Sequence, residues 1–340
     1  MAPRTKTLLR SVLSFLLAGI FLYVAFRGTD IDELMDSLKN VRYIWIILLI
    51  PVGLLSHFAR AYRWKFLLGH VKENLSIRNL FAAVMIGYMV NNALPRVGEI
   101  VRPYVVGRLE GISKSTALGS VVVERIIDLV AVAAIFCLVL FFSPGILSAF
   151  VEDAETLRPV FLAGSLASVL LLIILLLKSE SLIRSGKVLL RLAPARSRDR
   201  VQSLFESFVS GFRAASMKQH FGKIALTSAV IWGLYALGLY LPFFAYPEIA
   251  EAGLGFDAAI VLLTLSSMAF VLPAPGAFGT YHTFLKFALI RLFGINEVTA
   301  LSYTIVTHEL NVLITTLTGA YFLVKDHLKV SEIARGTEAG

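Results

Sequence analysis

Charged and amide side chains interrupt an otherwise apolar chain at one place early in the sequence. Asn91 and Asn92 end an apolar run, and Arg96, Glu99 and Arg102 follow at intervals of three residues. Residues spaced in this way form one slowly drifting stripe on a helix, so we expect the three charges to share a face. Two arginines could bind a phosphate through paired hydrogen bonds, and the carboxylate could orient them.

Pro95 and Gly98 lie in the same stretch and predict a break in the helix. Proline suits the first turn of a new helix, where its missing N–H costs nothing, and the start of a helix attracts anions. Broken backbone at membrane depth is tolerated only where protein or a water-filled cavity satisfies it. We therefore expect Asn91 and Asn92 to bond either substrate hydroxyls or the freed backbone.

A second group of charges, Glu124, Arg125 and Asp128, lies inside an apolar stretch. Glu124 and Asp128 share a helix face at i, i+4, and Arg125 can pair with Asp128 at i+3. A charge at the bilayer centre costs about 2.5–3.5 kcal/mol, so this group must be paired, lie shallow in the membrane or line a cavity. The sequence leaves open whether it handles substrate or is a structural ion-pair cluster.

Arg60 and Arg63 stand beside Trp64 at the end of another apolar stretch. Arginines next to a tryptophan are typical of an anchor at the lipid headgroups. The same arginines could instead join the phosphate site. Farther along, His308 and Glu309 could take part in proton coupling, because histidine titrates near neutral pH, or they could be structural.

The composition indicates a membrane protein with many spans. Hydrophobic residues make up 57% of the chain and charged residues 16%, and the mean hydropathy is +0.77. The net charge of +9 is placed between apolar stretches, which favours membrane orientation over nucleic-acid binding. Phosphate-binding loops, hydrolase motifs and cysteine–histidine metal spacings are missing, so we expect no enzyme, no cofactor and no metal. An intramembrane enzyme using Glu124, Asp128 or His308 is the alternative.

The apolar stretches and loop charges predict the architecture. We expect an all-α polytopic membrane protein with both termini cytoplasmic, since basic and acidic loops alternate. Its expected parts are six full spans (8–26, 41–58, 117–142, 159–177, 224–246, 298–324), two re-entrant broken helices (77–109, 257–293), a basic connection (178–223) with an amphipathic helix near 201–212, and a disordered tail (331–340) after one membrane domain (1–330).

The two broken elements resemble each other. Leu94-Pro95-x-x-Gly98 matches Leu272-Pro273-x-x-Gly276, and the segment from Gly111 to Leu118 matches that from Gly294 to Leu301. The predicted repeat cores are residues 77–142 and 257–324. Three spans lie between the broken elements, so the second copy should be inverted, as in many secondary transporters. The expected gate consists of Pro95, Gly98, Pro273, Pro275, Gly276 and Gly279.

Several of these motifs together resemble the transmembrane region of the lysylphosphatidylglycerol synthases, the flippase-like membrane half of the multiple peptide resistance factor. They are Asn92-x-x-Pro95-x-x-Gly98-Glu99-x-x-Arg102, Glu124-Arg125-x-x-Asp128, Arg60-x-x-Arg63-Trp64 and Pro273-x-Pro275-Gly276-x-x-Gly279. The resemblance implies a bacterial or archaeal cytoplasmic-membrane protein that moves a lipid between leaflets.

The chain departs from that family in two places. The soluble aminoacyl-transferase domain of the synthases is missing after residue 324, so lysine transfer is not expected. Family members often carry a glutamate just after the second break, where this chain has Thr280-Tyr281-His282. Acid-based coupling is therefore not assigned to that position.

The sequence thus predicts translocation of an anionic phospholipid or a polyprenyl-phosphate-linked sugar. Its expected substrate-binding residues are Arg60, Arg63, Asn91, Asn92, Arg96, Glu99, Arg102, Glu124, Arg125 and Asp128. The alternative is a non-transporting scaffold that docks a membrane enzyme through the basic connection.

Overall fold

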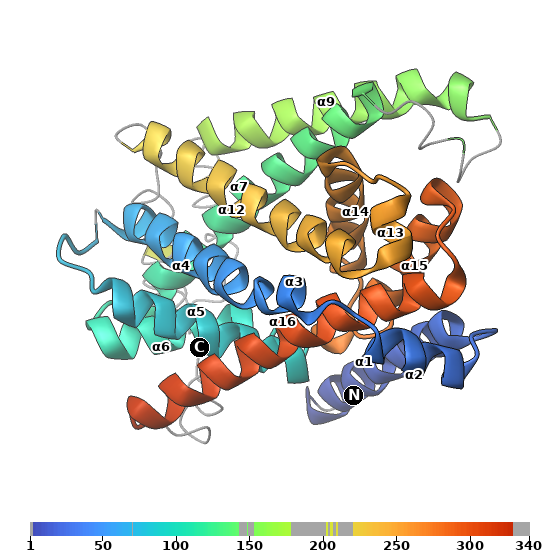
Figure 1. The fold of residues 1–340 in the computed structure, drawn as a ribbon. Helices are drawn as coiled ribbons and strands as arrows, with labels where there is room; N and C mark the ends of the chain where they lie inside the picture. The colour runs from blue at the N-terminus through green and yellow to red at the C-terminus, as the bar shows by residue number, and fades with distance from the viewer. Residues whose placement is uncertain are drawn as a thin grey trace.

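The computed structural model describes residues 3–69, 71–142, 153–177 and 220–328, with a few isolated positions between them. Within these residues the secondary structure is helical throughout, which confirms the all-α prediction (Figure 1). Nearly all of the basic connection, most of the expected amphipathic helix and the predicted tail lie outside the described residues.

The described part of the chain forms a series of helices. In chain order they are α1 (Pro3–Phe26), α2 (Ile31–Lys39), α3 (Tyr43–Ile47), α4 (Leu49–Leu68), α5 (Ile77–Ala93), α6 (Gly98–Glu110), α7 (Lys114–Phe142), α9 (Ala154–Leu177), α12 (Phe221–Tyr240), η2 (Leu241–Ala245), α13 (Pro247–Glu251), α14 (Phe256–Ala269), η3 (Pro275–Ala277), α15 (Thr280–Phe293) and α16 (Glu297–Lys325).

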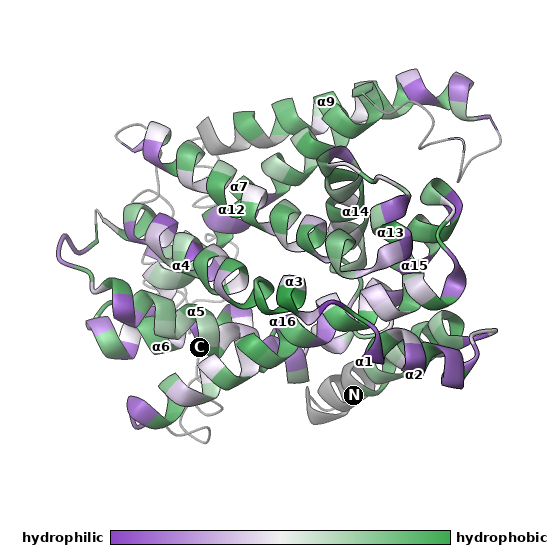
Figure 2. Ribbon diagram, in the orientation of Figure 1, coloured by the Kyte–Doolittle hydropathy of each residue, from purple (hydrophilic) through white to green (hydrophobic). Residues whose placement is uncertain are grey.

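Four helical segments among the described residues are long and apolar enough to cross a membrane: Tyr43–Leu68, Lys114–Phe142, Ala154–Leu171 and Phe221–Ala245. Figure 2 shows that α7, α9 and α12 are hydrophobic along most of their length. A fifth candidate joins α1 to α2 across an 86° bend. The prediction of six full spans is therefore supported for four or five, and α16 is not among the candidates.

The first broken element is a helix pair. α5 packs against α6, and Gly98 permits the contact, because a Cβ there would lie 2.0 Å from the Gly87 carbonyl oxygen. The sequence reasoning placed Pro95 in the first turn of the second helix, which is wrong. Arg96 has a φ of 66° and turns the chain, so α6 starts only at Gly98. Pro95 consequently lies in the connection.

The second broken element consists of α14, η3 and α15. Its connection contains two left-handed glycines, Gly276 with a φ of 52° and Gly279 with a φ of 76°. A Cβ on Gly276 would lie 3.3 Å from the Asn92 Cα atom. Arg96 Nη2 donates a 2.8 Å hydrogen bond to the Val271 carbonyl oxygen. The two breaks, far apart in sequence, therefore touch.

The segments after the two broken elements have matching helices. Gly111 and Gly294 end α6 and α15 in the left-handed conformation, with φ of 70° and 68°. α7 and α16 each begin three residues later and each contain 29 residues. α16 runs from α15 to α5, and α7 contacts α14, so each long helix packs on the other half (Figure 1).

Candidate functional site

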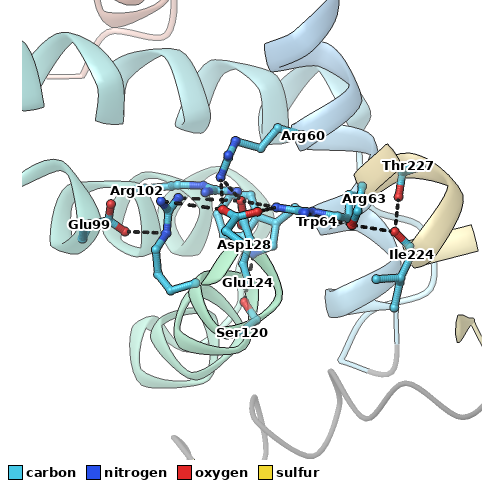
Figure 3. A network of polar contacts seen from close by, with 12 residues as sticks. Arg60, Arg63, Trp64, Glu99, Arg102, Ser120, Glu124, Asp128, Ile224 and Thr227 are labelled. Carbon is cyan, nitrogen blue, oxygen red and sulfur yellow. Dashed lines mark hydrogen bonds and ion pairs between the residues drawn. The ribbon is translucent and has the colours of Figure 1, made fainter. Parts of the chain in front are cut away.

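Two buried carboxylates on α7 form the centre of a charged cluster. Glu124 has no exposed side-chain surface and Asp128 has 11%. Their i, i+4 spacing places both on one helix face, as predicted, and arginines of α4 and α6 approach them from other sides (Figure 3).

Helix α4 supplies two arginines, one turn apart. Arg60 Nη1 donates to Glu124 Oε1 at 2.6 Å and to Asp128 Oδ2 at 2.9 Å. Arg63 Nη2 donates to Asp128 Oδ1 at 2.6 Å and to Glu124 Oε1 at 3.3 Å. Both arginines are buried, with Arg63 fully so. An anchor at the lipid headgroups would leave them exposed, so that interpretation is wrong for this structure.

Arg102 reaches the cluster from α6. Its Nη2 atom forms a 2.7 Å ion pair with Glu124 Oε2, and its guanidinium carbon lies 3.8 Å from the centre of the Trp64 ring. Trp64 in turn donates from Nε1 to Ser120 Oγ at 2.9 Å, which fixes the ring. A desolvated cation–π contact contributes about 2 kcal/mol. Among the described residues, Arg102 Nε has no hydrogen-bond partner.

Arg125 and Glu99 lie at the edge of the cluster. Arg125 Nε is 3.4 Å from Glu99 Oε2, and these side chains are 39% and 32% exposed. The other guanidinium nitrogens of Arg125 face Asp128 Oδ2 at 3.7 Å and Glu124 Oε1 at 3.8 Å. The predicted i+3 pairing of Arg125 with Asp128 is thus present. Arg125 and Glu99 together connect the buried charges to the exterior.

The cluster carries more positive than negative charge. Four arginines (Arg60, Arg63, Arg102, Arg125) meet three carboxylates (Glu99, Glu124, Asp128), which leaves a formal charge of +1. Buried charges are stable only when paired and hydrogen-bonded, so an excess guanidinium favours an anionic ligand.

Two residues of α12 that the sequence reasoning did not select complete the site. The Tyr235 hydroxyl accepts hydrogen bonds from Arg60 Nε at 3.3 Å and Nη2 at 3.1 Å. Ser228 Oγ accepts from Arg63 Nη1 at 3.0 Å. Their spacing of seven residues puts them on one helix face, which is the only signal that the sequence offered. Helix α12 thus holds both arginines by hydrogen bonds in addition to their ion pairs with α7.

The remaining predicted residues lie at the breaks. Asn91 Oδ1 accepts from the Gly98 backbone N–H at 2.7 Å, and Asn92 Nδ2 donates to Thr315 Oγ1 and Thr316 Oγ1 at 3.0 Å each. These amides therefore bond the freed backbone and α16. Arg96 is exposed and contacts the second break, so the predicted stripe of Arg96 with Glu99 and Arg102 is not formed.

The predicted gate residues lie at these same connections. Pro95 and Gly98 flank the first, and Pro273, Pro275, Gly276 and Gly279 form the second. His308 and Glu309 of α16 lie beside the second, because His308 Nε2 is 2.8 Å from the Gly276 carbonyl oxygen.

Comparison with known proteins agrees with the sequence motifs. Residues 11–319 match the family described as the lysylphosphatidylglycerol synthase TM region. No solved structure matches the chain significantly.

Several archaeal proteins are similar. A UPF0104 membrane protein of Methanothermobacter thermautotrophicus is 26% identical over 82% of each chain. One of Methanocaldococcus jannaschii is 32% identical over 43% of this chain and 41% of its own length. The glycosyltransferase AglD of Haloferax volcanii is 22% identical over 93% of this chain, which spans about half (54%) of that protein. With its motifs and the family match over most of its length, the chain belongs to the lysylphosphatidylglycerol synthase TM region family of membrane proteins.

Proposed function

We propose that this protein translocates an anionic lipid, or a lipid-linked sugar phosphate, across the cytoplasmic membrane of a bacterium or archaeon. The observation that carries the proposal is the buried arginine cluster with one positive charge in excess of its carboxylates. A phosphate group supplies the missing negative charge, and guanidinium groups bind it through paired hydrogen bonds.

The headgroup enters past Arg125 and Glu99, the most exposed pair of the cluster. It exchanges with Glu99 as the partner of Arg125 and then reaches Arg102, whose Nε atom has a hydrogen still to donate within the described part of the chain. Glu124 and Asp128 keep the guanidinium groups separated and oriented. Tyr235 and Ser228 hold Arg60 and Arg63 in place.

Two halves of opposite orientation provide the movement. Helices α7 and α16 have the same length, and each packs against the other half of the chain. Both features support an internal repeat, and the spans between the two copies would invert the second one. In transporters of this type, one half rocks against the other around a site near the midplane. Here the touching connections, from Leu94 to Val97 and from Phe270 to Gly279, form the gate. Both termini are then cytoplasmic.

The alternative is a scaffold for a membrane enzyme that acts on lipids. The similarity to AglD, which is named a glycosyltransferase, favours this alternative, because the matched region makes up only about half of that protein. A scaffold tolerates loss of Arg102 as long as the protein folds and keeps its partner. A transporter does not tolerate that loss.

Lipid movement in reconstituted vesicles distinguishes the two functions. Arg102→Lys keeps the charge but loses the planar fork, so we expect translocation of a labelled anionic phospholipid to fall about tenfold, the factor that follows from losing one charge-assisted hydrogen bond. The matched control is Arg158→Lys on α9, where the native arginine donates only to the Leu140 and Phe141 carbonyls among described residues. Rates are normalised to folded protein. Unchanged normalised rates in both Arg102→Lys and Arg102→Ala contradict substrate handling by this arginine.

A further inference from the structure

Three potential metal ligands meet beside the second break. His282 lies on α15, and His308 and Glu309 are neighbours on α16. One ligand atom from each lies within 4.8 Å of the other two. Both imidazole rings are buried, whereas the Glu309 side chain is 44% exposed. None of the charged cluster's arginines takes part, so this group is separate from the proposed phosphate site.

The hydrogen bond from His308 to the second break places a hydrogen on one nitrogen of its ring. The Gly276 carbonyl oxygen can only accept, so the Nε2 atom 2.8 Å away carries the hydrogen. In the neutral ring, Nδ1 then presents its lone pair to Glu309 Oε1 at 3.0 Å. His282 Nε2 lies 3.5 Å from that same oxygen. Electron-rich atoms facing one another at these distances are stabilised by a cation between them.

We propose that His282, His308 and Glu309 bind a divalent transition-metal ion, with Zn²⁺ as the best fit. Two imidazoles and one carboxylate form a ligand set that proteins use for zinc. Ligands 2.0–2.1 Å from a tetrahedral zinc lie about 3.3 Å from one another, close to the two separations from Glu309 Oε1. The exposed side of Glu309 leaves the fourth position to water.

The surroundings of the ring match those of metal-bound histidines. A ligating imidazole usually donates its second N–H to a carbonyl or carboxylate, as His308 does to Gly276. The Phe278 and Tyr281 rings pack against His308, with centroid distances of 4.9 and 5.0 Å. Their apolar contacts keep the ring in place and exclude water from it.

The metal site lies where it can stabilise the contact between the two broken elements. The ion would join α15 to α16 through His282 and His308 while His308 holds the Gly276 carbonyl. Because Gly276 lies against Asn92, an occupied site stabilises the contact between the two breaks. Counted from Gly294, His308 stands where Arg125 stands counted from Gly111. The metal ligand and the arginine are therefore counterparts in the matching segments.

A Co²⁺ titration of the full chain in detergent tests the proposal. The protein carries an affinity tag without histidine, is stripped with a chelator and is then titrated. We expect one Co²⁺ per chain, an intense visible band typical of four or five ligands, and displacement of that band by Zn²⁺. A weak octahedral spectrum, or binding of much less than one ion per chain, would overturn the proposal.

Three variants and one control locate the ion. His282→Gln, His308→Gln and Glu309→Gln should each weaken binding by more than about tenfold, since even outer partners of a metal ligand carry that much affinity. His327→Gln, an exposed histidine after α16, should bind as the unaltered chain does. Equal affinity in all four variants contradicts the site.

X-ray absorption on the Zn²⁺-loaded unaltered protein keeps the test independent of how the variants fold. Two imidazole ligands at about 2.0–2.1 Å are expected, and a spectrum without imidazole overturns the proposal. None of these measurements uses lipid, so the metal site and the proposed translocation stand or fall separately.

Discussion

The charged cluster around Glu124 and the histidine cluster around His308 occupy corresponding places, yet they are built in opposite ways. The first is crowded: Glu124 alone contacts four arginines. The second contains no arginine or lysine contact among the described residues, and its carboxylate faces two imidazoles. The segments that follow Gly111 and Gly294 therefore differ in charge: arginines exceed carboxylates around Glu124, and a carboxylate without an arginine or lysine partner among the described residues lies beside His308.

This difference in charge explains which cluster can gain or lose an ion without destabilising the fold. Ion pairs in the first cluster are buried and interlocked, so removing one member leaves a charge that the low-dielectric interior penalises. In the second, two buried imidazoles face a carboxylate that is 44% exposed, so a cation can leave without stranding a fully buried charge. We infer that the first cluster binds the substrate phosphate and that cation binding at the second regulates the contact between the two breaks.

The largest effect is expected from Glu124→Gln. Removing this carboxylate leaves four arginines with two carboxylates, Asp128 and the partly exposed Glu99, and breaking a buried pair in this way costs about 3–5 kcal/mol. We expect a strong loss of folded protein and a lower unfolding temperature in detergent. Glu251→Gln, at the exposed end of α13, is the control. A variant as stable as the unaltered chain would mean that the arginines are not held by Glu124.

The next prediction compares the two breaks. A Cβ on Gly98 would meet the Gly87 carbonyl oxygen at 2.0 Å, whereas one on Gly276 would meet the Phe278 ring at 3.1 Å. The first contact is backbone and the second is a side chain that can shift. We therefore expect Gly98→Ala to destabilise by about 1–3 kcal/mol, the usual cost of overpacking, and more than Gly276→Ala.

Helix α12 supplies the control for this pair. Gly233→Ala meets nothing within 4 Å and replaces a glycine inside a helix, so it should be neutral or slightly stabilising. Thermal unfolding of the three variants in one detergent gives the order. If Gly276→Ala proved costlier than Gly98→Ala, the strain of its left-handed backbone would outweigh the close helix contact at Gly98.

The sequence predicted the local features of this fold better than its long-range ones. The positions of the two breaks followed from Pro95, Gly98, Pro273 and Gly276, because proline and glycine act on their own backbone. The pairing of Glu124 with Asp128 on one face followed from helix periodicity. That α4 would bring Arg60 against them did not follow, since it depends on how separate helices pack.

The errors have physical causes of the same kind. Arg96 was expected on the helix stripe, but its left-handed backbone places it before the helix and directs it to the Val271 carbonyl. Tyr235 and Ser228 were missed because a tyrosine and a serine seven residues apart occur on many helices. His282 was seen only as a departure from the family pattern. Its closeness to His308 depends on the angle between α15 and α16.

The smallest effect is expected from Glu99→Gln. This variant tests whether the exposed Glu99–Arg125 pair is a mobile part of the charged cluster, separate from the buried and fixed part around Glu124. The Glu99–Arg125 pair is about one-third exposed on each side and 3.4 Å long, and exposed pairs contribute only about 0–1 kcal/mol. Stability should therefore hardly change. Because Glu99 competes with the substrate phosphate for Arg125 yet also orients that arginine, we expect lipid translocation to fall only about two- to threefold, and the loss to shrink as salt screens the pair. Vesicle assays at low and high salt, normalised to folded protein, measure this change in translocation.

A collapse of folded protein in Glu99→Gln would place Glu99 with Glu124 in the fixed part of the cluster. A salt-independent loss of transport would show that Glu99 acts on the substrate by contact rather than by charge.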